Sequence, residues 1–245
     1  MDVEIDVQQN RDLLVTERQR HLPTGPGTGT YVRIIPLDFV DSISDVQVHD
    51  SEDPIPASVQ IQDNQVSVHW FSTERGIQDR IFVLQYRTIS ALHIHDTDDQ
   101  VYWKPFFTDP KAPIQRGSVT VRLPDSLEGT VIGFDSYGQI ANTARKIDRQ
   151  TVEFVSNQPI DPNETVKVQV IFPHSVFSGP LPLWQQKDSG GDLLRNLALG
   201  FTVVALVALN QRPPAWHPLA YSPLGAGDLA WRARVGLQSV TQGFR

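Results

Sequence analysis

The residues best suited to bind a metal ion form one short run, HIHDTDD, at positions 93–99. His93 and His95 are two positions apart, so in a strand both imidazoles project to the same side, and Asp98 follows in the expected turn. Imidazole with carboxylate suits zinc or manganese. A solvated strand edge with an acidic turn has the same pattern, and a closed zinc site needs four donors. His93, His95 and Asp98 are therefore the candidate metal ligands, while no tight structural metal or other cofactor is expected.

A second possibility is an aromatic binding site in the run DDQVYWKPFF, at positions 98–107. Tyr102 and Trp103 could form an exposed platform that stacks on a sugar or another ligand. Alternatively, both rings pack in the core, and the phenol and indole N–H find backbone partners. Core packing is the favoured interpretation, with the two aspartates in the turn before the strand.

No catalytic motif is recognisable. The chain has no cysteine, no G-x-S-x-G elbow and no H-E-x-x-H helix. The run GPGTGT at 25–30 is followed by the strand-like YVRIIPL, whereas a phosphate-binding loop opens a helix. A paired-carboxylate glycoside hydrolase stays open, because the fold sets the spacing of that pair. The chain is not expected to be an enzyme.

The elements that would carry these residues are strands. Apolar and polar residues alternate with period 2 in short β-branched and aromatic runs, with turn residues between them. These runs are VEIDV (3–7), LLVTERQR (13–20), SVQIQ (58–62), QVSVHWF (65–71), IFVLQYRT (81–88), SVTVRL (118–123), TVEFV (151–155) and TVKVQVIF (165–172). Asp63-Asn64 predicts a hairpin turn, and residues 10–12 join the first two strands. The pattern predicts an all-β antiparallel sandwich, immunoglobulin-like, followed by a short apolar helix and an irregular tail.

Charge separates the body from the tail. From Leu193 onward there are five arginines and one acid, a net +4, so the chain's net charge of -7 leaves -11 for residues 1–192. An acidic body repels phosphate backbones, so the body is not expected to bind nucleic acid.

Several stretches in order resemble the N-terminal extracytoplasmic domain of a bacterial family of predicted membrane proteins, domain of unknown function 2207. The resemblance covers about residues 2–185. It is carried by VEIDVQQNRDLLVTE, GTYVRIIPL, LQYRTISAL, DDQVYWKPFF, PIQRGSVTVRLP and ETVKVQVIFPHSVF. In the family pattern an arginine precedes Ile-Pro-Leu, matched here by Arg33, and an acid precedes Tyr-Trp, matched by Asp99. Lys104 stands where asparagine is common. The candidate ligand or partner residues are Tyr31, Arg33, Tyr102 and Trp103.

The resemblance implies a signal segment, a β-sandwich outside the cytoplasm and then membrane helices, with no known activity. The domains are expected at 1–185 (extracytoplasmic sandwich), 186–196 (linker), 197–210 (apolar, membrane helix) and 211–245 (basic tail). Leu197–Leu209, LALGFTVVALVAL, is the expected membrane contact, and the basic flank after it is placed in the cytoplasm by the positive-inside rule. No secretory signal precedes Met1, so an export segment is expected to be missing from the chain as written.

The expected function is a membrane-anchored, non-enzymatic module for binding, sensing or interaction, with a protein or glycan as possible partner. The alternative is a secreted β-sandwich that binds or hydrolyses carbohydrate, with Trp103 and the His93, His95 and Asp98 cluster as its site.

Overall fold

The fold is that of a computed structural model. It describes residues 1–21, 29–72, 79–106, 113–139, 142–162, 164–174, 176–177 and 179–186. The chain divides into two compact units, Met1–Ala198 and Leu199–Arg245, and all described residues lie in the first. That unit is all-β and sandwich-like, as predicted. The expected apolar helix at 197–210 and the tail at 211–245 lie outside the described residues.

The largest sheet has eight strands in the order β13-β14-β11-β1-β2-β8-β4-β5. Its strands are β13 (Asn142–Lys146), β14 (Thr151–Ser156), β11 (Ser118–Arg122), β1 (Asp2–Val7), β2 (Leu13–His21), β8 (Arg80–Ile89), β4 (Ser42–Asp50) and β5 (Asp53–Ile55). All neighbours are antiparallel except β1 and β11, which pair in parallel from Asp2↔Ser118 to Asp6↔Arg122. The sheet is therefore mixed, whereas the sequence predicted an antiparallel one.

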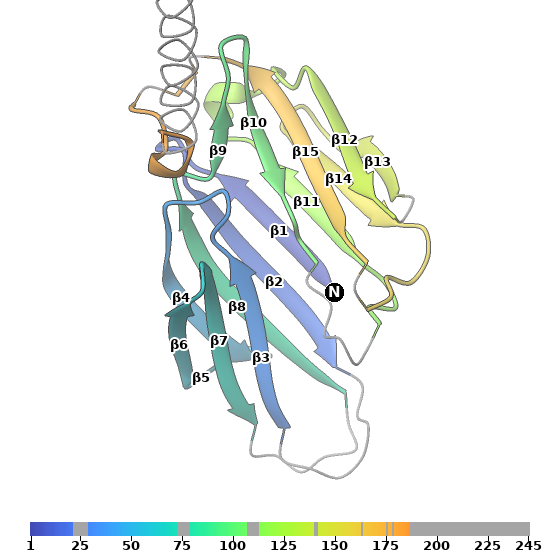
Figure 1. Cartoon of the computed structure of the whole chain (residues 1–245). Helices are drawn as coiled ribbons and strands as arrows, with labels where there is room; N and C mark the ends of the chain where they lie inside the picture. Colours follow the sequence, from blue (N-terminus) through green and yellow to red (C-terminus); the bar gives the residue numbers. More distant parts are fainter. Residues whose placement is uncertain are drawn as a thin grey trace, which may run out of the picture. The chain divides into compact units, whose positions relative to one another are not determined.

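Two smaller sheets cover one face of the large sheet (Figure 1). One has the order β12-β15-β10-β9 and the other β3-β7-β6. Their strands are β12 (Gly133–Gly138), β15 (Val166–Pro173), β10 (Asp98–Trp103), β9 (Leu92–Ile94), β3 (Gly29–Pro36), β7 (Gln65–Ser72) and β6 (Ala57–Gln62). A 3-10 turn, η1 (Asp125–Leu127), follows β11. Two sheets thus share one large partner, and β10 and β3 lie where they meet (Figure 1).

The core lies between the large sheet and its two covers. β8 presents Phe82, Leu84 and Tyr86, all fully buried, to the β3-β7-β6 sheet, as its alternation predicted. The ring of Phe82 lies 4.5 Å from Tyr31 of β3 and 5.7 Å from Trp70 of β7, centroid to centroid. On the other half, Phe134 of β12 and Phe154 of β14 meet at 6.4 Å. Burial of these rings supplies the main stabilisation.

The predicted turns form where turn chemistry placed them. Asp63 and Asn64 join β6 to β7 with φ of 50° and 59°, the two positive values that a type I′ hairpin requires. Arg11 joins β1 to β2 with φ of 72°. The expected turn at Asp98 and Asp99 is wrong, because β10 begins at Asp98. Its inward alternation buries Asp99 completely.

Candidate functional site

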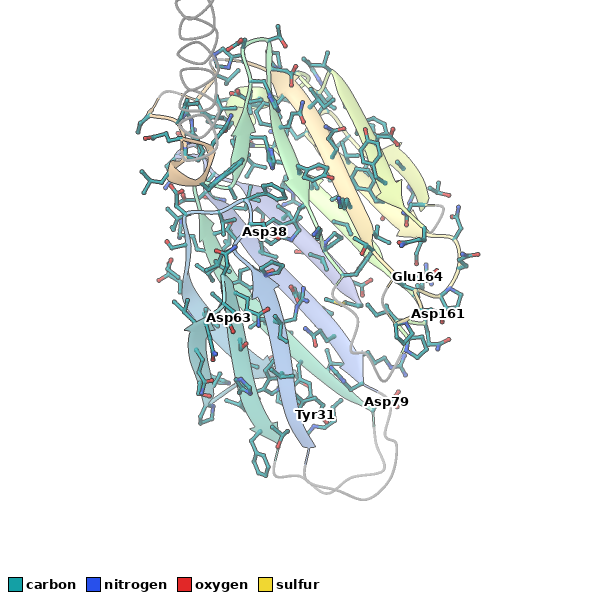
Figure 2. The ribbon with its side chains drawn as sticks, in the orientation of Figure 1. Tyr31, Asp38, Asp63, Asp79, Asp161 and Glu164 are labelled. Carbon is teal, nitrogen blue, oxygen red and sulfur yellow. The ribbon has the colours of Figure 1, made fainter. Side chains whose placement is uncertain are left out.

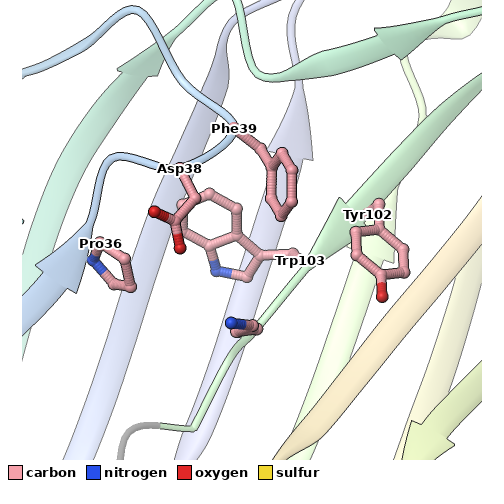
Figure 3. Close-up of a pocket in the computed structure, with 6 residues that line it drawn as sticks. Pro36, Asp38, Phe39, Tyr102 and Trp103 are labelled. Carbon is pink, nitrogen blue, oxygen red and sulfur yellow. The ribbon is translucent and has the colours of Figure 1, made fainter. Parts of the chain in front are cut away.

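A small cleft opens between the end of β3 and the end of β10. Six residues line it: Pro36, Asp38, Phe39, Tyr102, Trp103 and Lys104 (Figure 3). Its empty volume is about 330 Å³, counting the space open to solvent. Aromatic rings and a proline form most of the surface, and one carboxylate and one ammonium group are the charges. Binding sites for small molecules have this kind of lining, apolar with a few polar groups.

The hairpin turn between β6 and β7 holds one wall of this cleft. The Asn64 carbonyl accepts a hydrogen bond from the Leu37 N–H (2.9 Å), and the Asn64 amide donates to Asp38 Oδ1 (3.1 Å). The loop after β3 is therefore fastened at its first two residues. Asp38 and Tyr31 lie at opposite ends of β3 (Figure 2), so the strand separates the cleft from the Tyr31 aromatic contacts.

Alternation along β10 builds the other wall. Trp103 points inward and is 6% exposed, whereas Tyr102 points to the outer face, where its ring lies 5.5 Å from the Lys167 ammonium. The Trp103 indole N–H is buried and has no hydrogen-bond partner in the described part of the chain. The predicted backbone partner is thus absent there. Buried donors are nearly always paired, so this indole N–H is an exception within the described residues, and its nitrogen is not exposed to the cleft.

Four aromatic side chains form a cluster beside the cleft: Phe39, His93, Tyr102 and Trp184. The Phe39 centroid lies 4.9 Å from His93, 6.0 Å from Tyr102 and 5.5 Å from Trp184. His93 lies 5.3 Å from Tyr102 and 4.7 Å from Trp184. Burial, and secondarily the nearby His95, lower the pKa of His93 from 6.5 to about 4. The imidazole is therefore neutral at physiological pH.

Trp184 comes from a segment that we call the C-terminal strap, residues 176–177 and 179–186. Its backbone N–H donates to Asp41 Oδ1 (3.0 Å) and its indole N–H to the Ser90 carbonyl (2.9 Å). Gln185 accepts from the Ile94 N–H (3.1 Å) and donates to the Ile94 carbonyl, so the strap caps the edge of β9. These contacts hold the chain against the cluster just before residue 187.

The other end of the strap is held by a buried cation. Arg11 is 7% exposed, and its guanidinium donates to the carbonyls of Gly179 (3.0 Å), Pro180 (2.7 Å) and Phe177. Phe177 packs edge-on against Phe172 of β15 at 5.8 Å. A turn residue of the first hairpin thus anchors the last described segment.

The candidate metal ligands do not converge. The His93 and His95 rings are stacked at 6.3 Å, but His93 belongs to the aromatic cluster. The Asp98 carboxylate accepts from Gln100 Nε2 (2.6 Å) and Thr97 Oγ1 (2.9 Å), and these bonds, Gln100 first, lower its pKa. Within the described ranges, no group of three or more His, Cys, Asp and Glu residues is placed to hold a metal ion.

The remaining predicted ligand residues lie inside the sandwich. Arg33 forms a buried ion pair with Glu17 of β2. The Tyr31 ring is stacked on that of Trp70, with 5.8 Å between the centroids, and contacts Phe82 on the inner side of the β3-β7-β6 sheet. Only Tyr102 and Trp103 of the four line the cleft.

Sequence reasoning missed Phe39 and Trp184, since neither lies in an alternating run. A tryptophan soon after the last strand, in PLPLW, was the available signal for a docked segment. It also missed the pair of Asp99 with His174, whose Nδ1 lies 2.9 Å from Asp99 Oδ1. Asp99 Oδ2 is buried without a partner among the described residues.

Comparison with known proteins identifies a family but no activity. A family model described as "Predicted membrane protein (DUF2207) N-terminal domain" matches residues 1–185. The match ends within the C-terminal strap. No curated protein matches the chain.

Proposed function

Because the chain belongs to the family of predicted membrane proteins with the DUF2207 N-terminal domain, we propose that its sandwich is an extracytoplasmic binding module anchored to the membrane. In this proposal the module holds a ligand in the cleft between β3 and β10 without transforming it. Binding of the ligand is signalled to the segment that follows residue 186.

The observation that carries the proposal is that Phe39 belongs both to the cleft lining and to the aromatic cluster that holds the strap. Its ring lines the cleft and also packs on Trp184 of the strap at 5.5 Å. Asp41, two residues on, accepts the Trp184 backbone N–H. A ligand that shifts the 37–41 loop therefore acts directly on the contacts that hold the strap, which is the linkage a sensing module requires.

The lining favours a saccharide over other small ligands. Phe39 and Tyr102 offer aromatic faces on which the apolar side of a sugar ring can stack. Lys104 Nζ is a donor and Asp38 is an acceptor, so hydroxyl and carbonyl groups of a sugar have partners of both kinds.

A non-catalytic role fits the same residues. Asp38 is the only acid among the six lining residues, and no histidine accompanies it. A glycoside hydrolase of the usual kind needs two carboxylates across the scissile bond. The cleft has binding groups but lacks that pair.

Anchoring is proposed through Leu197–Leu209, which lies outside the described residues. No helix in the described ranges has the length and apolar character to cross a bilayer. The run is uncharged and basic residues follow it, so the positive-inside rule favours a cytoplasmic tail and an extracytoplasmic sandwich.

The test is direct titration of the purified full chain with a panel of neutral and acidic oligosaccharides, with tryptophan fluorescence as the signal that reports binding. Tyr102→Ala and Lys104→Ala should each weaken binding about tenfold, for the loss of about 1.4 kcal/mol. Phe71→Ala is the matched control, because Phe71 is an exposed aromatic residue of β7 outside the cleft. Unchanged affinity in both cleft variants would place the ligand elsewhere.

Coupling to the strap is tested by hydrogen exchange. Ligand should change the protection of the Trp184 amide in the wild type. It should fail to do so in Phe39→Ala, even where that variant still binds. Equal protection changes in both proteins would exclude Phe39 as the link.

A further inference from the structure

Among the strands that the structure describes, β6 has an open edge, and we propose that it pairs with β6 of a second copy of this chain. β6 is the outer strand of the β3-β7-β6 sheet (Figure 1). All six of its residues, ASVQIQ, are exposed. It contains no charge, no proline and no glycine, and such an edge is a template for pairing with another strand. This proposal does not depend on the ligand proposed for the cleft.

The other edges of the three sheets carry features that discourage pairing. β5 has three residues, with an acid and a proline, and β9 has three residues and is capped by Gln185. β13 carries Arg145 and Lys146. β12 has two glycines and an acid, and β3 has the inward-pointing Arg33 and a terminal proline. Among the edges of the described sheets, β6 alone lacks a protective device.

The side chains of β6 are also exposed where they should be covered. Val59 and Ile61 face the same side as the buried Val68 and Val66 opposite them on β7. Nevertheless, Val59 is 46% exposed and Ile61 is 69% exposed. The inner face of this sheet therefore continues past its last covered strand, and a further strand would bury both side chains.

Self-pairing around a two-fold axis at Gln60 matches this pattern. An antiparallel register with Gln60 opposite Gln60 of the partner places Val59 opposite the partner's Ile61, and Ser58 opposite the partner's Gln62. Directly opposite residues lie on one face of a sheet, so apolar meets apolar and polar meets polar. A register centred on Val59 would bring Pro56, which has no N–H, opposite Gln62. The Gln60 register avoids this and joins the two sheets into one.

Charge makes β6 the favourable place for two acidic bodies to meet. Residues 1–192 carry a net charge of -11, so two copies repel over most of their surface. The paired segment itself is uncharged. One strand pair buries much less than the roughly 800 Å² per partner of a stable interface. The dimer is therefore weak in solution and forms when copies are concentrated on a surface.

The absence of cysteine from the chain gives a clean experiment. Full-length single-thiol variants with a C-terminal histidine tag are bound to nickel-chelating vesicles, which concentrate them without using the native anchor. They are then oxidised and resolved on non-reducing gels. Gln60→Cys should form a disulfide dimer, because opposite Cβ atoms lie about 4.5–5.5 Å apart, near the reach of that bond. Thr143→Cys, exposed on the edge strand β13, is the matched control.

The register is tested by mixing. Ser58→Cys and Gln62→Cys should cross-link strongly as a mixture and weakly alone, because positions 58 and 62 are opposite only across the two-fold axis. Adding Ile61→Lys to Gln60→Cys should reduce the dimer at least tenfold, because lysine protects edges. Val59→Lys, added to Gln60→Cys in the same way, is the second variant and should have the same effect. Thermal melts establish that each variant folds.

Cross-linking at position 60 no greater than at position 143 would overturn the proposal. So would a Gln60→Cys dimer that persists in both folded lysine variants, or equal cross-linking of Ser58→Cys with itself and with Gln62→Cys.

Discussion

Arg33 and Glu17 form a bidentate ion pair in the interior of the sandwich. Arg33 Nε lies 2.7 Å from Glu17 Oε2, Arg33 Nη2 lies 2.6 Å from Oε1, and the side chains are 4% and 0% exposed. The Tyr86 hydroxyl donates to Oε1 (2.8 Å), and Arg33 Nη2 also donates to the Pro105 carbonyl (3.1 Å). β2, β3, β8 and the chain after β10 therefore meet at this pair. The ion pair fixes the position of the β3-β7-β6 sheet on the large sheet, next to the cleft.

Glu17→Ala should lower the free energy of unfolding by about 3–5 kcal/mol, because it leaves the Arg33 charge buried without a partner. Denaturant unfolding of the full chain measures this. The control is Glu153→Ala, which breaks a surface pair with the 65% exposed Arg145 and should cost at most about 1 kcal/mol.

The double variant Glu17→Leu with Arg33→Met separates desolvated charge from packing. It should be more stable than Glu17→Ala, since apolar replacements of similar volume often equal a buried ion pair. A double variant no more stable than the single one would mean that the hydrogen bonds to Tyr86 and Pro105 dominate. Burial, and then the charge of Glu17, raise the pKa of Tyr86 well above its usual value, so its phenol remains a donor.

Trp103→Ala should cost about 3–5 kcal/mol in unfolding free energy, the range for truncating a large buried ring. Trp103→Phe should cost less, because the lost indole N–H has no partner in the described part of the chain. A wild-type melting curve for Trp103→Ala would contradict the core position.

His93 should make the folded chain less stable in acid. Its pKa is about 4 in the folded chain against an ordinary value of 6.5, so the unfolded chain binds the proton first. Above pH 6.5 the effect is absent, and it grows as pH falls from 6.5 to 4, up to about 3 kcal/mol at about 1.36 kcal/mol per unit. His93→Phe should flatten this window in chemical denaturation between pH 4 and 7. His49→Gln, outside the aromatic cluster, should leave it unchanged.

No stoichiometric metal is expected on the purified chain. The His93 imidazole packs against aromatic side chains, and the Asp98 carboxylate accepts hydrogen bonds from Gln100 and Thr97. Elemental analysis of protein prepared without chelator measures zinc and manganese directly. A molar equivalent that disappears in a His93→Ala/His95→Ala variant would restore the metal-site interpretation.

Period-2 alternation predicted the long strands well, because one face of each is buried against a second layer. The predicted run 81–88 became β8 (Arg80–Ile89), and 165–172 became β15 (Val166–Pro173). β4 was missed because its register shifts between Ser44 and Gln47, with Asp45 at φ of 53°, which breaks the alternation. The short strands β5 and β9 are too brief to show a period.

The site was harder to predict than the strands. Tyr102 and Trp103 were singled out, but whether they bind or pack depends on Phe39 and Trp184, which lie about 60 to 80 residues away in sequence. Period-2 alternation puts Glu17 on the inward face of β2 with Leu13 and Val15, but the local sequence does not show that Arg33 of β3 pairs with its buried charge. Such contacts between sheets have no local signal.

Membrane anchoring by Leu197–Leu209 is the prediction that depends most on sequence. Thirteen uncharged residues span roughly 20 Å at 1.5 Å per residue, against a hydrocarbon core of about 30 Å. Length alone argues against a full crossing, and Pro213 and Pro214 end any helix soon after. However, the run has no polar stripe, so it does not suit a surface helix. The family's description as membrane proteins favours insertion.

The full chain, expressed behind a bacterial signal sequence, should therefore be recovered in carbonate-washed membranes. Protease should cut residues 1–185 only from the periplasmic side, since the four arginines and one acid after the run hold the tail inside. Changing Val203 and Val204 to aspartate should release the chain, because each acid adds about 2.5–3.5 kcal/mol to insertion at a helix centre. Aspartates at Ser222 and Ser239, beyond the run, are the matched control and should leave it in the membrane. Recovery of the unaltered chain as a soluble monomer would refute the anchor and favour a helix packed against protein.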